Sequence, residues 1–299
     1  MERGNQDRLT IEYQRPDPRL NPYISGYHRY TLRLGAGERI QDVLFPGWAN
    51  VRFSVGAGPW RVRLGRRTFE PVPDAALFGP SSHAGYVDAG SGTLVGAGIT
   101  PVGWARLFGV DASAFADRVV PLEAVIGADA QRVAAELNSG GAPAATFDAF
   151  FLARLQQMPA EPHDVAALFA ALGEPGVDSV TALAERLDAS LRTVSRVSRS
   201  AFGFTPKLLL RRARFMRALM AALTLGRGRW SEALGPAGYY DQSHFLKDCR
   251  LFLGCSLGAF AAYPKPLAEL SMRLRDQALG APVQALHGTS AIPPKMVEL

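Results

Sequence analysis

The chain has 299 residues, of which 47% are apolar, so it is long enough to bury two cores of roughly 100 to 150 residues each. Its two cysteines are too few for a disulfide framework or a zinc site, which favours a reducing compartment. No uncharged apolar stretch reaches the length of a membrane span and no apolar signal core opens the chain, so we expect a cytoplasmic protein without a membrane partner.

The formal charge of +6 is unevenly distributed. Residues 179–263 hold 13 Lys and Arg against 5 Asp and Glu, a net charge of +8, which leaves about −2 for the rest of the chain. A basic segment joined to a slightly acidic one favours a nucleic-acid-binding unit attached to something else, because phosphate neutralisation is the main sequence-independent source of affinity. Charge alone leaves a solvated basic surface as the alternative.

Short alternating runs separated by Gly and Pro fill the chain from Tyr30 to Ile99, for example in residues 31–34, 51–55 and 60–64. Alternation with a period of two predicts an antiparallel sheet, either closed into a barrel or packed as a sandwich. Helices are expected in residues 112–118, 128–138 and 146–158. We therefore predict a two-domain α+β protein, with a β-rich N-terminal regulatory or sensory domain in residues 1–158.

Residues 159–178 form a predicted linker with a short helix in residues 165–172. The following third of the chain is helical and contains an internal repeat at an offset of 51 residues. The repeat pairs Leu183 with Leu234, Val194 with Phe245, Arg196 with Lys247, Arg199 with Arg250 and Gly203 with Gly254. Two copies of one helix-turn-helix unit are the simplest account.

The first unit is expected to contain a helix from Leu191 to Phe202, with Ser190 as its N-cap and Gly203 as its C-terminal stop. Helical spacing places a cationic face opposite an apolar one. The cationic face holds Arg192, Ser195, Arg196 and Arg199, and the apolar face holds Val194, Val197 and Ala201.

The second unit repeats this arrangement from Asp241 onward, where Phe245, Cys249 and Phe252 share one face. We interpret Cys249 as a small core residue. Between the units, Thr205 caps a helix that starts at Pro206 and ends near Gly226. Such a helix is roughly 30 Å long, close to the roughly 34 Å between successive major-groove faces on one side of B-DNA.

The region from about Ser179 to Tyr263 resembles the double helix-turn-helix domain of AraC/XylS-type bacterial transcription regulators. The main matches are Gly238, Tyr239, Asp241, Gln242, Ser243, His244, Phe245, Lys247, Arg250, Gly254 and Ser256. Weaker matches are Leu183, Ala184, Ser190, Thr193, Arg196, Gly203, Thr205 and Pro206. The resemblance implies an all-α DNA-binding domain in residues 179–263, with a long linker helix between its two units.

By position, the resemblance implies DNA contacts at Arg192, Ser195, Arg196, Arg199, Gln242, Ser243, His244, Lys247 and Arg250. An arginine bonds guanine and a glutamine bonds adenine in bidentate fashion, and Arg199 and Arg250 are expected on phosphate. Three departures concern the second unit: the Gly235-Pro236 pair, Leu257 in place of the usual proline, and no arginine after Phe260. Proline disfavours a helix interior, so the supporting helix of this unit is expected to be short and its DNA binding weaker.

The N-terminal part more loosely resembles the barrel-like sensory domains of one subgroup of these regulators. Trp48, Trp60 and Trp104 are candidates for lining a ligand pocket, with a purely structural core role as the alternative. His28 and His83 are isolated and lack the pattern of a metal-binding barrel, so we expect no metal and no other cofactor.

The leading hypothesis is a sequence-specific transcription regulator controlled by a small-molecule effector or by dimerisation through the N-terminal domain. Its expected partners are double-stranded DNA, RNA polymerase, an effector and a second copy of the chain. One alternative is an N-terminal interaction module without a ligand. The other is an enzyme fused to a DNA-binding module, which is disfavoured because alkyl transfer needs a thiolate and no cysteine precedes Cys249.

In residues 264–299 we expect a helix from Pro266 to Leu279, with Leu267, Leu270 and Leu274 as a face that docks on the protein. From Gly280 onward the sequence lacks periodicity and predicts a disordered tail.

Overall fold

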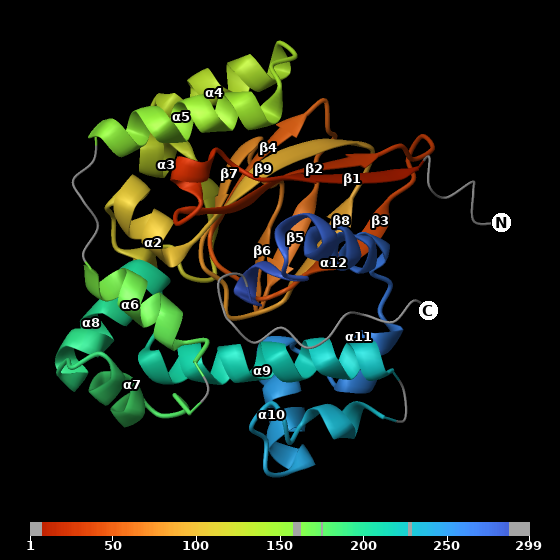
Figure 1. Ribbon diagram of the computed structural model, residues 1–299. Coiled ribbons are helices and arrows are strands. Elements are labelled where there is room, and N and C mark those ends of the chain that lie inside the picture. Colours follow the sequence, from red (N-terminus) through yellow and green to blue (C-terminus); the bar gives the residue numbers. More distant parts are fainter. Residues whose placement is uncertain (1–7, 158–162, 175, 227–228, 287–299) are drawn as a thin grey trace.

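The computed structural model describes residues 8–157, 163–174, 176–226 and 229–286 (Figure 1). The N-terminal half is built on two antiparallel sheets. The larger sheet has the order β1 (Leu9–Gln14), β2 (Ile24–Leu32), β9 (Gly92–Ile99), β4 (Asn50–Val55), β7 (Ala75–Phe78) and β10 (Val119–Pro121). The smaller sheet has the order β3 (Ile40–Leu44), β8 (Gly85–Ala89), β5 (Arg61–Leu64) and β6 (Arg67–Phe69).

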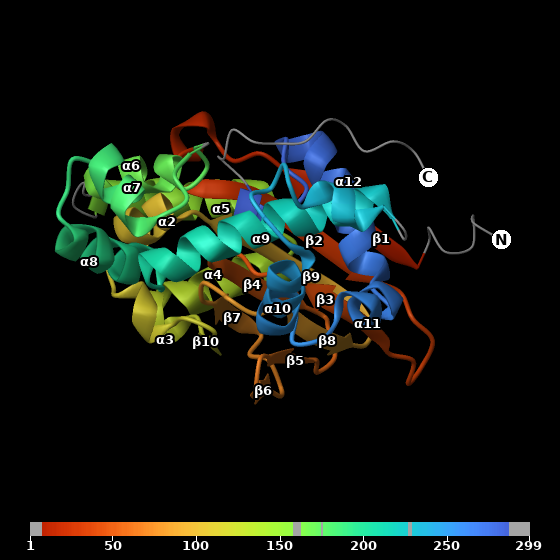
Figure 2. The same cartoon turned by 90° about the horizontal axis from the view of Figure 1, so that it is seen from below.

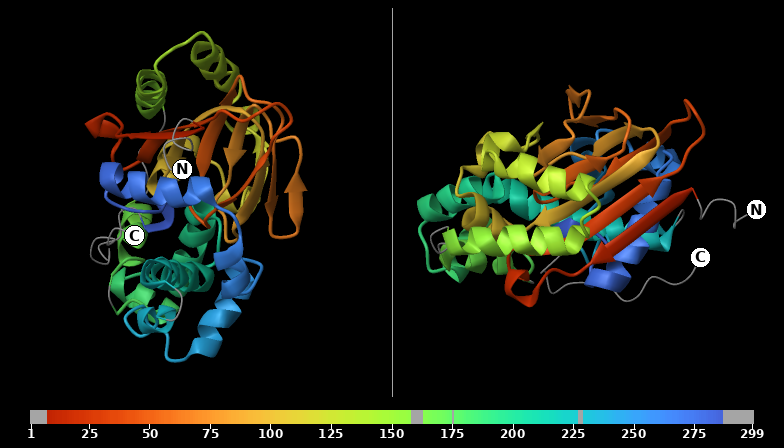
Figure 3. Two further views of the ribbon diagram at one scale, coloured as in Figure 1. Left: turned by 90° about the vertical axis from the view of Figure 1, so that its right-hand side faces the viewer. Right: turned by 90° about the horizontal axis from the view of Figure 1, so that it is seen from above.

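The two sheets pack face to face, so the predicted β-rich domain is a sandwich (Figure 3). Between them Trp60 stacks on Phe78 with ring centroids 5.7 Å apart. The period-two alternation of β4 decides which side each residue faces, because Val51 and Phe53 pack outward under the helices. Arg52, between them in sequence, consequently faces the space between the sheets.

Helices cover the outer face of the larger sheet (Figure 1). They are α3 (Glu123–Ile126), α4 (Asp129–Asn138) and α5 (Pro143–Gln157), and α2 (Pro101–Gly103) with the π-type turn Trp104–Phe108 lies at one end of the sheet. The helix predicted for residues 112–118 is wrong beyond a 3-10 turn at Ala112–Ala114. Asp117 has a φ of 54°, which ends helical geometry, and the chain then pairs with β7 as β10.

The C-terminal half consists of helices, most of which lie on the opposite side of the molecule from α4 and α5, while the last of them lies beside the sandwich (Figure 1). They are α6 (His163–Ala171), α7 (Val180–Arg186), α8 (Leu191–Phe202), α9 (Pro206–Leu225), α10 (Gln242–Phe252), α11 (Leu257–Ala262) and α12 (Pro266–Leu279). Seen from below, α9 runs past the sandwich with α8 near its first turns and α10 beside its middle (Figure 2). The predicted linker helix is confirmed.

The two halves share hydrophobic cores. Trp48 and Val102 of the N-terminal half pack with α6, α8 and the first turns of α9. Val43 and Ala84 pack with α9 and α10. The helical half therefore rests directly on the sandwich.

Arg212 of α9 lies at the centre of this contact with 2% of its surface exposed. Its Nη1 donates to the carbonyl oxygens of Gly47 at 3.1 Å and Ser81 at 2.7 Å. Its guanidinium lies 4.0 Å from the centroid of the Trp48 ring. Burial lowers the pKa of Arg212 to about 9, which still leaves it charged at neutral pH. One buried cation thus joins the linker helix to two loops of the sandwich.

Asp117 fixes the loop that accepts the hydrogen bond from Arg212. Its carboxylate accepts the backbone N–H of Ser82 at 2.7 Å and the Ser82 hydroxyl at 2.8 Å. The imidazole of His83 lies 3.5 Å from the same carboxylate, and this interaction raises the pKa of His83. Although burial acts to raise it, the hydrogen bonds from His83 and Ser82 bring the pKa of Asp117 below its ordinary value.

Helix α12 returns to the sandwich and packs on β1 and β3, as expected for this helix. The predicted docking face is not the buried one, because Leu267, Leu270 and Leu274 are half-buried while Ala268 and Arg275 are buried. The backbone N–H groups of Leu267 and Ala268 donate to the Asp42 carboxylate of β3, so the sheet caps the helix from outside. At the other end, Leu279 fits against Gly26, where an added Cβ would lie 2.3 Å from its side chain.

The expected disorder after Gly280 is wrong for residues 281–286. Ala281, Val283, Ala285 and Leu286 are buried, and the Gln284 amide donates to the Ala49 carbonyl at 3.0 Å. An irregular segment can be buried through tertiary contacts alone, and such contacts leave no periodicity in the sequence. Residues 287–299 of the predicted tail lie outside the described part of the chain.

Replacing Arg212 with Met is expected to lower the free energy of unfolding by roughly 2–4 kcal/mol, because two buried carbonyl groups lose their donor. Urea unfolding measures this change. Lys207→Ala, at an exposed position of the same helix, is the control and is expected to change stability by less than about 0.5 kcal/mol. An Arg212→Met variant as stable as the wild type would contradict the role of this contact.

The His83–Asp117 contact predicts a pH dependence of stability. Because the pKa of His83 is raised in the folded state, its stabilisation is fully present below the unfolded value of about 6.5 and is lost as pH rises through the folded value. Thermal unfolding of the wild type between pH 6 and 9 is expected to show this loss, and His83→Gln is expected to flatten it. If the melting temperatures of the wild type and His83→Gln changed equally with pH, the His83–Asp117 contact would not be the source of the pH dependence.

Candidate nucleic-acid interface and ligand cavity

The first helix-turn-helix unit comprises α7 and α8. The Ser190 hydroxyl accepts the N–H of Thr193 at 3.1 Å, and α8 ends at Gly203 with a φ of 82°. Val194, Val197, Ala201 and Phe202 are buried between α7, α9 and the sandwich. The predicted helix boundaries and both caps are confirmed.

The opposite face of α8 is free for a partner. Arg192, Arg196 and Arg199 are exposed, and Ser195 is half-buried. The Arg196 guanidinium lies 4.0 Å from the Asp164 carboxylate of α6, and 67% of its side chain remains exposed. This contact leaves the arginine accessible, because exposed ion pairs at this distance are weak.

The second unit presents α10 in the same manner. The Asp241 carboxylate accepts the N–H of His244 at 2.9 Å, while Phe245, Cys249 and Phe252 are buried. Burial raises the pKa of the Cys249 thiol to about 12, so this cysteine is a core residue and not a nucleophile. The predicted contact residues of this unit are all exposed, namely Gln242, Ser243, His244, Lys247 and Arg250.

The internal repeat seen in the sequence is also a structural repeat. Positions 51 residues apart carry the same local role: Ser190 and Asp241 are N-caps, and Gly203 and Gly254 have φ values of 82° and 73°. Thr205 and Ser256 cap the helices that follow, α9 and α11.

The units differ in the element that supports α10. Where α7 supports α8, the second unit has only a 3-10 turn at Trp230–Ala233, which confirms the expected short supporting helix. Trp230 stacks on Phe245 with centroids 5.8 Å apart, so an aromatic contact takes part of the helix's place.

Buried hydrogen bonds to Asp248 fix α10 on the linker helix. This carboxylate has 2% of its side chain exposed, accepts a hydrogen bond from Nε of Arg211 of α9 at 2.7 Å and forms an ion pair with Nη2 of the same residue at 2.6 Å. It also accepts the hydroxyl of Tyr239. The orientation of α10 therefore depends on a charge that the linker helix supplies.

The geometry of these units agrees with a match between residues 183–263 and the model of a helix-turn-helix domain family. Residues 183–263 form an AraC-type helix-turn-helix domain. The match covers residues 183–263 and assigns this domain, not the whole chain, to the family.

Similarity to other proteins is remote. The crystal structure of ToxT from Vibrio cholerae O395 covers 74% of this chain and 96% of its own, at 9% identity and a TM-score of 0.40. An apo variant of ToxT from V. cholerae strain SCE256 covers 84% of this chain and 95% of its own, at 7% identity and a TM-score of 0.42. A comparison with curated proteins found no match. Within the described residues, no helix combines the length and the apolar composition that crossing a membrane requires.

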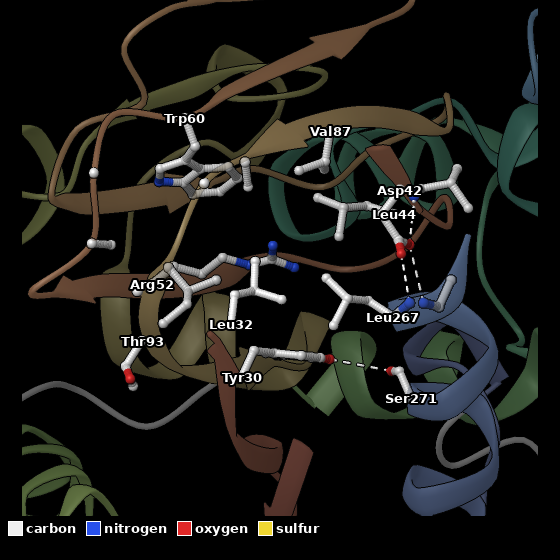
Figure 4. Close-up of a pocket in the computed structure, with 18 residues that line it drawn as sticks. Tyr30, Leu32, Asp42, Leu44, Arg52, Trp60, Val87, Thr93, Leu267 and Ser271 are labelled. Carbon is white, nitrogen blue, oxygen red and sulfur yellow. Dashed lines mark hydrogen bonds between the residues drawn. The ribbon is translucent and has the colours of Figure 1, made fainter. Parts of the chain in front are cut away.

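Outside the AraC-type domain, a cavity of about 690 Å³, including its open mouth, lies between the two sheets and α12 (Figure 4). Its walls are mainly apolar and include Leu32, Leu44, Val87 and Trp60 of the sandwich and Leu267 of α12. The helix that follows the AraC-type domain thus forms part of the cavity wall.

Of the three tryptophans considered for a ligand site, only Trp60 lines this cavity. Trp48 packs against Phe169 and Phe202 under Arg212, and Trp104 is buried in the core with its indole N–H donating to Val110. Trp48 and Trp104 therefore have the purely structural core role that was the alternative to lining a pocket. Residues 8–157, 163–174, 176–226 and 229–286 contain no cluster of three or more metal-ligating side chains.

Arg52 is the main polar group of the cavity, and sequence analysis did not single it out. Its guanidinium projects among the apolar side chains, 4.5 Å from the Phe78 ring centroid, and its Nε donates to Asn50 at 3.3 Å (Figure 4). Burial lowers the pKa of Arg52, and no carboxylate of the described residues pairs with it. The alternation of Val51, Arg52 and Phe53 in the sequence shows that Arg52 faces the other side of the sheet from its neighbours. It does not show which side is the interior of the sandwich, because that depends on the helices that cover the face of Val51 and Phe53.

Two further features line the cavity beside Arg52. The hydroxyls of Tyr13 and Ser271 lie 2.6 Å apart, and the Tyr30 hydroxyl lies 3.2 Å from Ser271, so α12 closes this wall through polar contacts (Figure 4). In the adjoining part of the cavity, the buried Nε2 of His28 has no hydrogen-bond partner. Burial, and then Arg52 and Arg275, hold the pKa of His28 well below its usual value.

Asp248→Asn is expected to lower the free energy of unfolding by roughly 1–3 kcal/mol, because it weakens a buried, charge-assisted hydrogen-bond set. Glu232→Gln is a matched control, since Glu232 also pairs with an arginine but has 53% of its side chain exposed. Denaturant unfolding compares the two variants. If Glu232→Gln lowered the free energy of unfolding more than Asp248→Asn, the stabilising role of the Asp248 hydrogen bonds would be contradicted.

Proposed function

We propose that the protein reads DNA sequence through the exposed faces of α8 and α10, and that a small molecule in the cavity controls this binding. The observation that carries the proposal is the repeated geometry of a capped helix with one buried apolar face and one exposed polar or basic face. Such helices enter the major groove with their N-terminal residues directed at base edges.

The residues divide by chemistry between base and backbone contacts. Arg192 and Arg196 offer bidentate donors for guanine, and Gln242 offers a bidentate pair for adenine. Ser195, Ser243, His244 and Lys247 complete the two faces. Arg199 and Arg250, at the third turn of each helix, are suited to phosphate. The linker helix of 20 residues, roughly 30 Å long, joins the two units, and successive major-groove faces on one side of B-DNA are roughly 34 Å apart.

Selection of binding sites from randomised duplex DNA with the full-length protein, at defined salt, tests this proposal. A bipartite motif with halves about one helical turn apart supports both reading faces. A single short box would mean that the second unit, with its 3-10 turn in place of a supporting helix, contributes only phosphate contacts. No enrichment, with or without candidate effectors, would overturn sequence-specific binding.

The effector part of the proposal depends on Arg52. A cation among apolar side chains is usually paired. The groups that line the cavity with Arg52 are an uncharged His28, tyrosine hydroxyls, apolar walls and the Asp42 carboxylate, which accepts backbone N–H groups of α12 and forms no ion pair with Arg52 in the described residues. An anionic molecule with an apolar body would supply both the missing charge and the contacts for the walls. Dimerisation and contact with RNA polymerase stay predictions from the family resemblance.

Arg196→Ala is expected to lower specific affinity by roughly 1–3 kcal/mol and to relax base preference at one position of the selected site. Arg199→Ala is expected to weaken binding uniformly across sequences and to reduce the salt dependence by about one phosphate contact. Quantitative binding to a library of single-base variants at two salt concentrations measures both effects. Uniform weakening by Arg196→Ala would assign Arg196 to the backbone instead.

Arg52→Gln is expected to abolish binding of apolar carboxylates to the cavity. Thermal shifts with matched pairs of apolar carboxylates and their amides provide the measurement, since a ligand at 100 times its Kd stabilises the native state by about 2.7 kcal/mol. The wild type and Arg29→Gln, at an exposed position of β2, are expected to respond to carboxylates only. Equal shifts by amides, or none across the panel, would contradict an anionic effector.

A further inference from the structure

Four large apolar side chains are exposed in the described part of the chain, and three of them lie in the AraC-type domain. Leu191 is 55% exposed, Tyr240 is fully exposed, and Leu246 is 39% exposed, while the fourth, Val110, lies in the N-terminal half. An isolated exposed leucine needs no explanation. What matters here is where Leu191 and Leu246 fall in the repeat.

The offset of 51 residues places Leu191 at the position of Gln242, the first residue of α10. The same offset places Leu246 at the position of Ser195. Gln242 and Ser195 are both proposed DNA-contact residues. Each leucine therefore stands where the other unit carries a polar side chain directed at DNA.

Helical geometry supports the same placement. Leu191 is one helical turn before Ser195 on α8, and Leu246 is one turn after Gln242 and one turn before Arg250 on α10. Leu246 lies among the exposed side chains of α10, between Gln242 and Arg250. Leu191 is on the same side of α8 as Val194 but is exposed because it is the first residue of the helix. A partner that covers the exposed faces of α8 and α10 must accommodate an aliphatic side chain among cationic and polar ones.

We propose that Leu191 and Leu246 each contact the 5-methyl group of a thymine in the major groove. This proposal rests on the proposed function. The thymine methyl is the apolar feature of the major-groove edge, and aliphatic side chains recognise it by burial. Each recognition helix then combines hydrogen-bonding residues with one apolar contact, so each half of the binding site contains a thymine that its arginines and glutamine do not specify.

Substitution of deoxyuridine for thymidine tests the proposal, because it removes only the methyl group. With the site selected by the wild-type protein, each thymine is replaced singly and affinity is measured. Burial of one methyl group corresponds to about a fourfold change in affinity. The wild type is expected to lose about fourfold at one thymine in each half, and Leu191→Ala and Leu246→Ala are each expected to become insensitive at one of these positions.

Val110→Ala is the control, since it trims an apolar residue about as exposed as Leu246 and outside the DNA-binding half, and it is expected to retain the wild-type response at every thymine. Leu191 and Leu246 are exposed, and alanine favours helices, so both variants are expected to fold. The proposal is overturned if the wild type ignores every uracil substitution, or if the leucine variants keep its full sensitivity. If the protein does not bind DNA sequence-specifically, selection from randomised DNA yields no site, and this outcome is distinct from a selected site that is insensitive to uracil.

Discussion

The burial of Arg212 is the constraint on which the arrangement of the molecule depends. A charged guanidinium in a low-dielectric environment is strongly unfavourable unless it is hydrogen-bonded. In Arg212, Nη1 donates to two carbonyls of the sandwich rather than to a carboxylate, while the buried Nη2 has no hydrogen-bond partner in the described residues. Its ring partner Trp48 also contacts Phe202 at the end of α8. The linker helix, the first unit and the sandwich therefore share one contact. Because α10 packs on the same helix through Asp248, the positions of both recognition helices follow from how α9 sits on the sandwich.

Helix α12 gives the cavity a direct physical connection to the DNA-binding half. It follows α11 after three residues, its N-terminus is capped by Asp42, and Leu267 and Ser271 line the cavity. A ligand can shift a conformational equilibrium only through different interactions in the two states. Here the candidate ligand would touch a helix that is covalently continuous with the second unit, so a change in how α12 packs would reach α10 and α11 without a separate relay.

Sequence patterns predicted the helical half well because its determinants are local. Ser190, Gly203, Thr205 and Asp241 set helix ends by hydrogen bonds to their own neighbours, and these residues are recognisable in the sequence. The cavity was missed because Arg52 becomes an interior residue only through the covering of the other sheet face by α4 and α5. Residues 281–286 were missed for a similar reason, since tertiary contacts alone bury them. Leu191 and Leu246 were overlooked because only polar side chains were considered for DNA contact.

The difference between the supports of α8 and α10 has a consequence for motion. Both units pack on α9 and on the sandwich, but the first also packs on the supporting helix α7 and on α6. In the second, a 3-10 turn with one stacked tryptophan stands in place of the supporting helix. Segments with fewer cooperative contacts open at lower free energy and exchange their amide hydrogens sooner. The turn Trp230–Ala233 before α10 is therefore expected to be less protected than α7, and duplex DNA would slow hydrogen exchange there more than in α8. One half of the binding site would thus be read by a preorganised helix and the other by a helix that is ordered further on contact.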